Sequence, residues 1–142
     1  MKCLSLKQPY AELLVSCKKT MEVRTWNTNF RGQFLVHASK KINEEACERL
    51  KIDQAKLVTG AIIGKANLYE VISYGSKNSL IKDKDKHFAD SNYEKLKYGF
   101  LINYAKRLDI PIPNSGKLGF FNVESNGPRL DRKKVRRHLE KN

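Results

Sequence analysis

The stretch CKKTMEVRTWNTNFRG, residues 17–32, is the part of the chain from which the fold is first predicted. Its polar and apolar side chains alternate, which is the period of a β-strand with one buried face. Met21 and Val23 lie on one face of this strand, whereas Glu22 and Arg24 lie on the other. Two opposite charges on one face can pair with each other or act together on a ligand. Spacing alone favours the first alternative, a surface ion pair worth under about 1 kcal/mol.

Other parts of the chain show comparable local signals. The turn sequence NTNFRG is followed by the β-rich run GQFLVHASK, so the sequence predicts a hairpin over residues 20–40. Asn43 is a predicted helix N-cap, and the glutamates after it suit the first turn of a helix over residues 43–51. Gly64 lies inside the long β-rich run 60–74 and indicates a bulge or bend.

The remaining elements are short. Residues 75–87 carry charges of both signs without an apolar period, so we expect a mobile loop there that could act as a lid. The two prolines of IPIPNSG are expected to end the strand before them. Further strands are predicted at residues 3–6, 98–109 and 117–125, and further helices at residues 10–16 and 88–97. Together these elements suit a small mixed barrel and not a doubly wound sheet.

The composition limits the class of protein. With 142 residues, of which 40% are apolar and 30% charged, the chain is typical of one globular domain with a real core. Cys3, Cys17 and Cys47 form no CxxC pair, and the histidines are equally scattered, so we expect no disulfide framework, metal site or cofactor. No run resembles a signal peptide or a membrane helix, so we expect a cytoplasmic monomer without membrane contact.

The net charge of +13 is the strongest bulk signal. A strongly basic domain favours polyanionic partners such as nucleic acid, because each phosphate that is neutralised releases condensed counterions. We expect the domain to cover residues 1–125 and to be followed by a basic tail, residues 126–142. This tail either contacts a phosphate backbone or only adds solubility, and the first alternative is favoured. The tail residues predicted to contact phosphates are Arg132, Lys133, Lys134, Arg136 and Arg137.

Candidate ligand-binding residues also lie within the domain. Trp26 stands beside basic residues, where an exposed indole would be a stacking platform for any base, although a lone Trp more often belongs to the core. Ser39, Lys40 and Lys41 precede a predicted helix whose N-terminus could hold a phosphate. A solvated loop is the equal alternative for these three residues. His37 lies on the same strand and is expected to have a structural role.

Five short motifs follow one another along the chain, namely Gln8-Pro9-Tyr10, Lys19-x-x-Glu22-x-Arg24, His37-Ala38-Ser39, Gly60-x-x-x-Gly64 and Gly116-x-x-Gly119-Phe120. Their types and order resemble the ASCH domain (activating signal cointegrator homology), a branch of the PUA-like superfamily. The resemblance extends from residue 3 to about residue 123 and is more specific than any single motif. The family has glycine where this chain has Cys17, so either Cys17 is left-handed or this turn differs.

The resemblance implies an α+β fold, a small PUA-like mixed β-barrel of about five or six strands with two or three short helices. It also implies a cleft lined by the charged residues of the second motif, Lys19, Glu22 and Arg24. PUA relatives bind RNA, and ASCH proteins were proposed as RNA-binding modules. The favoured function is therefore a nucleic-acid-binding module for RNA, with Lys19, Arg24 and Trp26 among its binding residues.

Some ASCH relatives are enzymes, so two alternatives stay open. One bacterial branch hydrolyses the amide of N4-acetylcytidine with Lys, Thr and Glu, and another relative is described as a ribonuclease. By resemblance Lys19 matches the lysine, whereas Glu22 stands in place of the hydroxyl nucleophile. In a metal-independent amidohydrolase or a ribonuclease, Glu22 would activate water, and Lys19 or Arg24 would stabilise the oxyanion. The position of Glu70 in the sequence does not show whether it supplies a second carboxylate.

Overall fold

Six strands form one mixed sheet in the computed structural model, which describes residues 1–123. The strands are β1 (Lys2–Gln8), β2 (Met21–Arg24), β3 (Gly32–Ile42), β4 (Ala61–Ser73), β5 (Tyr98–Pro113) and β6 (Phe120–Asn122). Their order across the sheet is β2-β5-β4-β3-β1-β6. All neighbouring strands pair antiparallel except β1 and β3, which run parallel.

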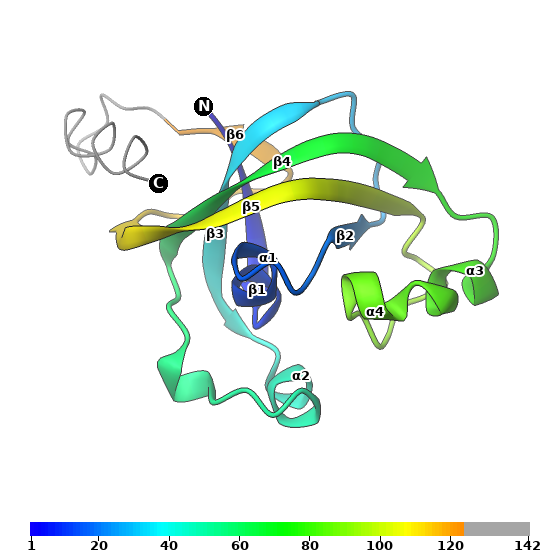
Figure 1. Ribbon diagram of the computed structural model, residues 1–142, viewed down its shortest axis with the longest axis horizontal. Helices are drawn as coiled ribbons and strands as arrows, with labels where there is room; N and C mark the ends of the chain where they lie inside the picture. Colours follow the sequence, from blue (N-terminus) through cyan, green and yellow to red (C-terminus); the bar gives the residue numbers. More distant parts are fainter. Residues whose placement is uncertain (124–142) are drawn as a thin grey trace.

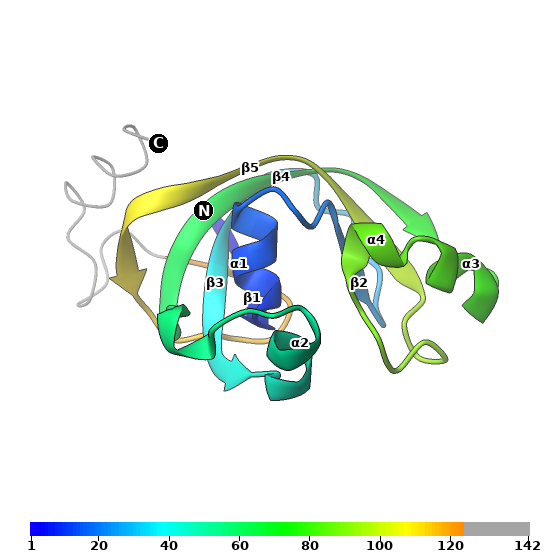
Figure 2. The ribbon, with the colours of Figure 1, turned by 60° about the horizontal axis from the view of Figure 1, so that its bottom comes forward.

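Short helices complete the described part of the chain. They are α1 (Tyr10–Val15), α2 (Glu44–Arg49), α3 (Lys77–Lys82) and α4 (Lys84–His87), with a 3-10 turn at Gln54–Lys56. Figure 1 shows β4 and β5 as two long arches side by side, with α1 below them. In Figure 2, α1 lies within the curve of the sheet, where it contacts β1, β3, β4 and β5.

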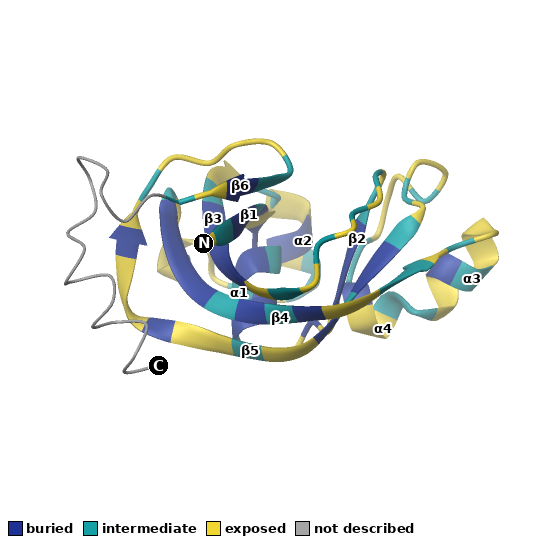
Figure 3. Ribbon diagram, turned by 90° about the horizontal axis from the view of Figure 1, so that it is seen from above, coloured by how far each residue is buried: buried dark blue, intermediate teal, exposed yellow. Residues whose placement is uncertain are grey.

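The main core lies between α1 and the concave face of the sheet. Leu14 and Val15 of α1 pack there with Phe34 of β3 and Phe100 of β5. Burial changes along the two long strands. The first residues of β4 are buried, whereas most of β5 after residue 103 is exposed (Figure 3). Each long strand is therefore buried over its first residues and more exposed toward its end, and because the two strands are antiparallel, their buried parts lie at opposite ends of the pair.

The expected barrel is wrong, whereas the α+β class and the presence of six strands are confirmed. β2 and β6 are the two edges of the described sheet, and they do not pair with each other. β2 has four residues and pairs only with the start of β5, so it is too short to close the sheet. The described residues also contain four helices, more than expected. The relationship to PUA-like proteins stays a prediction.

The predicted hairpin over residues 20–40 is also wrong. Both strands exist, but β2 pairs with β5, where Met21 lies opposite Leu101, and β3 pairs with β1 and β4. Met21 and Val23 pack with Leu80 of α3 in a small cluster of their own. A period of two identifies a strand and its buried face, but it does not identify the partner strand.

Residues 75–87 form two short helices, α3 and α4, instead of the expected loop. Ser76 caps α3, because its side chain accepts a hydrogen bond from a backbone N–H of the first turn. Leu80 and His87 are the two fully buried side chains of this segment. Two buried side chains, seven residues apart, are too few to show a helical period in the sequence, which explains why alternating charge suggested a loop.

Two further boundaries differ from the prediction. Residues 88–97 contain no helix, since Phe88 and Asn92 take positive φ angles of 64° and 60° that interrupt a right-handed helix. β5 continues through Pro111 and Pro113, although prolines were expected to end it. β2 pairs with β5 only up to residue 101, so the prolines lie where one side of β5 has no strand partner and no N–H is needed.

Two local predictions are confirmed, and the alternative left open for Cys17 is decided. Asn43 caps α2 by accepting a hydrogen bond from the backbone N–H of Ala46. The ladder shifts register at Gly64, where a Cβ would lie 2.4 Å from Cγ1 of Val15, so glycine lets α1 pack directly on the sheet. Cys17 takes the left-handed conformation, with φ of 67°. The first two features depend on local backbone geometry, which residue type alone indicates.

Candidate functional site

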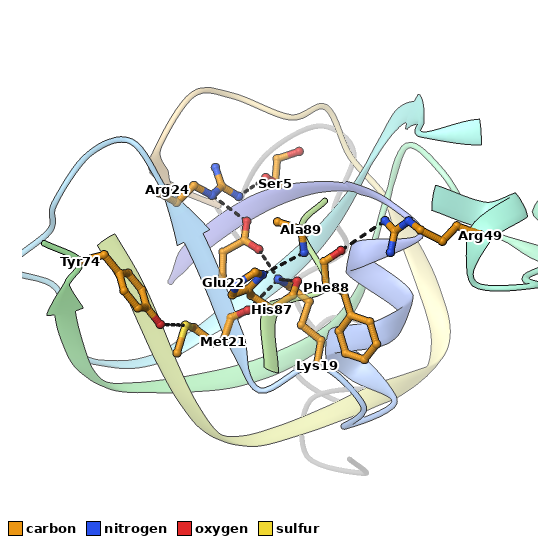
Figure 4. A network of polar contacts seen from close by, with 10 residues as sticks. All are labelled: Ser5, Lys19, Met21, Glu22, Arg24, Arg49, Tyr74, His87, Phe88 and Ala89. Atoms are coloured by element: carbon orange, nitrogen blue, oxygen red, sulfur yellow. Dashed lines mark hydrogen bonds and ion pairs between the residues drawn. The ribbon is translucent and has the colours of Figure 1, made fainter. Parts of the chain in front are cut away.

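A buried ion network joins the start of β2 to its neighbouring segments (Figure 4). Nζ of Lys19 donates to the backbone oxygens of Met21 at 2.7 Å and His87 at 2.8 Å, and lies 2.9 Å from Oε1 of Glu22. These three acceptors match the three N–H bonds of an ammonium group. The side chain of Lys19 is 2% exposed, so it holds the end of α4 against β2 and does not reach solvent.

Glu22 binds one cation on each carboxylate oxygen. Oε1 contacts Lys19, and Oε2 accepts a hydrogen bond from Nε of Arg24 at 2.7 Å. Burial raises the pKa of Glu22, but the charges and hydrogen bonds of Lys19 and Arg24 outweigh it and hold that pKa below its ordinary value. Burial lowers the pKa of Lys19 against the attraction of Glu22. Because Nζ faces acceptors only, the ammonium form satisfies them and the pair is ionic.

Arg24 extends this network to the surface. Its Nη2 donates to the backbone oxygen of Ser5 on β1 at 2.9 Å, and its guanidinium lies 5.7 Å from the centre of the Trp26 ring. The indole packs edge-on against Phe100 and Phe120, with centroid distances of 5.3 and 6.0 Å. Trp26 is therefore half-buried, and these contacts hold its ring in one orientation.

A pocket of about 1140 Å³ opens beside Arg24 and Trp26. Its walls come from β1, β2, β3 and the segment 113–119 that precedes β6. The cationic residues that line it are Lys7, Arg24, Lys40, Lys41 and Lys117, and among the described residues no Asp or Glu lines it. A concave wall of one charge sign attracts anions more strongly than the same charges on a flat surface.

The lining also contains a Ser–His pair. Ser5 and His37 are direct partners in the parallel ladder of β1 and β3, and Ser5 Oγ lies 2.8 Å from Nδ1 of His37. Nε2 of His37 lies 2.7 Å from the backbone oxygen of Asn114. Burial lowers the pKa of His37. These contacts join the segment 113–119 to the sheet, in agreement with the structural role expected for His37.

Comparison with known families decides the identity of this domain. The family model described as ASCH domain matches residues 4–112. The chain belongs to the ASCH domain family. Within residues 1–123, the ASCH domain has no group of His, Cys, Asp or Glu side chains arranged to hold a metal ion, and none of its helices is long and apolar enough to cross a membrane.

Solved ASCH structures share the fold. The crystal structure of an ASCH protein from Zymomonas mobilis is 16% identical, with 99% of this chain and 93% of that chain covered and a TM-score of 0.65. A serine-to-alanine variant of that protein is 17% identical over 95% and 94% of the two chains, again with a TM-score of 0.65. At this identity the likeness concerns the fold alone. No curated protein matches the chain significantly.

The pocket of this ASCH domain brings together five of the eleven predicted nucleic-acid-binding residues. Those that line it are Arg24, Trp26, Ser39, Lys40 and Lys41. Lys19 does not line it, because it is buried in the ion network. No residue of α2 lines it either, so the N-terminus of α2 is not part of the pocket lining. The predicted tail residues, Arg132, Lys133, Lys134, Arg136 and Arg137, lie outside the described residues.

The residues suggested as catalytic lie together, but they face one another. Lys19, Glu22 and Arg24 form one network, and only Arg24 lines the pocket. Glu70 is separate from this network, since its exposed carboxylate lies 3.2 Å from Nη2 of Arg31. The arrangement therefore positions Arg24 well, while it leaves Lys19 and Glu22 little freedom to act on a ligand.

The lining residues that the sequence did not predict include the polar side chains of Ser5, Lys7 and Lys117. Ser5 and Lys7 alternate on β1, so a period of two placed them on one face, but nothing nearby indicated a pocket there. Lys117 lies between the two glycines of the last motif, where the sequence indicates only a turn. The pocket forms only where β1, β3 and the segment 113–119 come together in the fold, so no one of these segments predicts it.

Proposed function

We propose that this ASCH domain binds single-stranded RNA, with phosphates in the pocket beside Trp26. The observation that carries the proposal is the positive charge of the pocket lining. Lys and Arg side chains line the pocket, and none of the described Asp or Glu residues does. Phosphates are the anions that a nucleic acid presents at regular spacing, and each one that is neutralised releases counterions. The net charge of +13 supports the same partner.

Trp26 supports a single strand as the partner. Bases stack on aromatic rings with little dependence on their identity. The indole lines the pocket, and edge-on contacts with Phe100 and Phe120 hold its orientation. A base is free to stack on a protein ring only where it is not already stacked in a duplex, as in a loop or a single strand of RNA. The pocket thus offers a phosphate contact and a base contact side by side.

Amide hydrolysis and RNA cleavage have less support. Each N–H bond of Lys19 has a partner, and its side chain is 2% exposed. Both carboxylate oxygens of Glu22 are bound to cations, so neither is placed to take a proton from water in the pocket. RNA binding uses the pocket as it stands, without a chemical role for this buried pair.

Anisotropy titration of a fluorescein-labelled oligouridylate at several KCl concentrations tests the proposal. The logarithm of the affinity should fall steeply with the logarithm of salt concentration. In the double variant Lys40→Ala/Lys41→Ala, this slope should decrease by about 0.7 for each phosphate that is no longer neutralised. The matched control is Lys82→Ala/Lys95→Ala, which removes two exposed lysines outside the pocket. Binding that does not respond to salt, or equal effects in both double variants, would refute the proposal.

A further inference from the structure

The hydroxyl of Ser5 has a defined direction of hydrogen bonding in the pocket. Nε2 of His37 lies 2.7 Å from the backbone oxygen of Asn114, and because a carbonyl only accepts, Nε2 carries the proton. Burial lowers the pKa of His37, so the ring is neutral and Nδ1 is an acceptor. The Ser5 hydroxyl, 2.8 Å from Nδ1, therefore donates to it. Toward a ligand, Ser5 Oγ can then only accept a hydrogen bond.

The surrounding backbone holds this pair in place. Ser5 and His37 are partners in the β1–β3 ladder, which puts their side chains on the same face of the sheet. Gly116 lies directly against them, because a Cβ there would be 2.9 Å from Ser5 Oγ and 3.1 Å from Nδ1 of His37. Both the sheet and the segment 113–119 thus restrict the movement of the hydroxyl.

A cation lies next to this acceptor. Nη2 of Arg24 donates to the backbone oxygen of Ser5 itself at 2.9 Å, and both residues line the pocket. The contacts to Glu22 and Ser5 use two of the five N–H groups of a guanidinium. A ribonucleotide presents complementary groups close together, since its phosphate only accepts hydrogen bonds and its 2′-hydroxyl can donate one.

We infer that Ser5 Oγ accepts a hydrogen bond from the 2′-hydroxyl of a nucleotide whose phosphate is bound by Arg24, so that the pocket prefers RNA to DNA. This inference rests on the proposed binding of a nucleic acid strand, and it names the residue that distinguishes the two sugars. In DNA the donor is missing, so Ser5 Oγ keeps its hydrogen bond to His37 but accepts none from the sugar. The net effect of one such hydrogen bond is roughly a fivefold difference in affinity.

Three labelled oligomers of one base test this assignment: oligouridylate, its 2′-deoxy counterpart and its 2′-O-methyl counterpart. The last keeps an oxygen at the 2′ position but cannot donate a hydrogen bond. The wild-type protein should bind oligouridylate about fivefold more tightly than either of the others. Ser5→Ala should bind all three with the affinity that the wild type shows for the deoxy oligomer. Ser91→Ala removes an exposed hydroxyl outside the pocket and should keep the fivefold preference.

Two results would overturn the inference. Equal wild-type affinity for oligouridylate and its 2′-O-methyl form would do so without any variant. A preference that persists in Ser5→Ala, with folding verified by its melting temperature, would do so as well. If the wild type binds none of the three oligomers, the proposed function fails and this inference fails with it. If it binds all three equally, with the expected dependence on salt, the role of Ser5 is refuted while the proposed function stands.

Discussion

Oε2 of Glu22 lies 2.7 Å from Nε of Arg24, and this contact sets the direction in which the guanidinium enters the pocket. The other oxygen of the same carboxylate binds Lys19, which holds the end of α4. One side chain therefore connects a buried structural cation to a cation that faces the pocket. Glu22 acts here as a positioning residue for Arg24.

The buried pair makes stability sensitive to Glu22. In Glu22→Gln, Lys19 keeps two backbone acceptors but has no charge to balance its own, so we expect the free energy of unfolding to fall by about 3 kcal/mol. Urea denaturation measures this decrease. The double variant Lys19→Met/Glu22→Gln no longer buries an unpaired charge, and we expect it to be destabilised less than the two single variants added together. If the loss of unfolding free energy in the double variant equals the sum of the losses in the two single variants, this account of the pair is contradicted.

Acid should weaken the fold through the same carboxyl. The pKa of Glu22 in the folded protein lies below its ordinary value of 4.5. A carboxyl of this kind contributes its full stability above pH 4.5, and the contribution disappears as the pH falls through the folded-state pKa. Denaturation midpoints recorded from neutral pH down to about pH 3 should decline less in Glu22→Gln than in the wild type. If the midpoints of the two proteins decline equally with pH, Glu22 does not contribute to the loss of stability in acid.

Gly64 should not tolerate a side chain. A Cβ at this position would lie 2.4 Å from Cγ1 of Val15 and 2.6 Å from the backbone oxygen of Lys106, so α1 would have to move away from the sheet. We expect Gly64→Ala to lower the free energy of unfolding by about 3 kcal/mol. Gly75→Ala is the matched control, because a Cβ at Gly75 meets no atom within 4 Å. Similar midpoints for both variants in urea would contradict the close packing of α1.

Glycine should stabilise the turn after α1. Cys17 has a φ of 67°, which is strained for a residue with a Cβ. Cys17→Gly should raise the free energy of unfolding by about 1 kcal/mol, even though it removes the thiol that donates to the backbone oxygen of Ala105. Cys17→Ala keeps the Cβ and should bring no gain. Thermal melts compare the wild type and the two variants directly. A higher melting temperature in Cys17→Ala would show that loss of the thiol, and not relief of backbone strain, causes the stabilisation.

Intrinsic fluorescence should report on the pocket. Trp26 is the single tryptophan of the chain, and it lines the pocket. If a base stacks on the indole, emission should decrease as oligouridylate is added, and the titration should give the same affinity as anisotropy. Inorganic polyphosphate has the charge without the base, so it should compete for binding but leave the emission nearly unchanged. Constant emission at saturation with RNA would exclude stacking on Trp26.

Local features of this protein could be predicted from the sequence because they depend on neighbouring residues. Alternation located β2 and assigned Met21 and Val23 to its buried face, and the N-cap at Asn43 and the bulge at Gly64 followed from residue type. The motif order also identified the family. Alternation further placed Glu22 and Arg24 on one face, where they form an ion pair.

The tertiary structure decided everything that depends on distant residues. The pairing of β2 with β5 and the open sheet could not be read from alternation, because a strand pattern does not name its partner. Lys19 was predicted to line the cleft, yet it is buried, with Glu22 as its counter-ion and with a carbonyl 68 residues away, that of His87, as one of its hydrogen-bond acceptors. The pocket likewise forms only where β1, β3 and the segment 113–119 meet. Burial and concavity arise from contacts between segments, and no single segment carries that information.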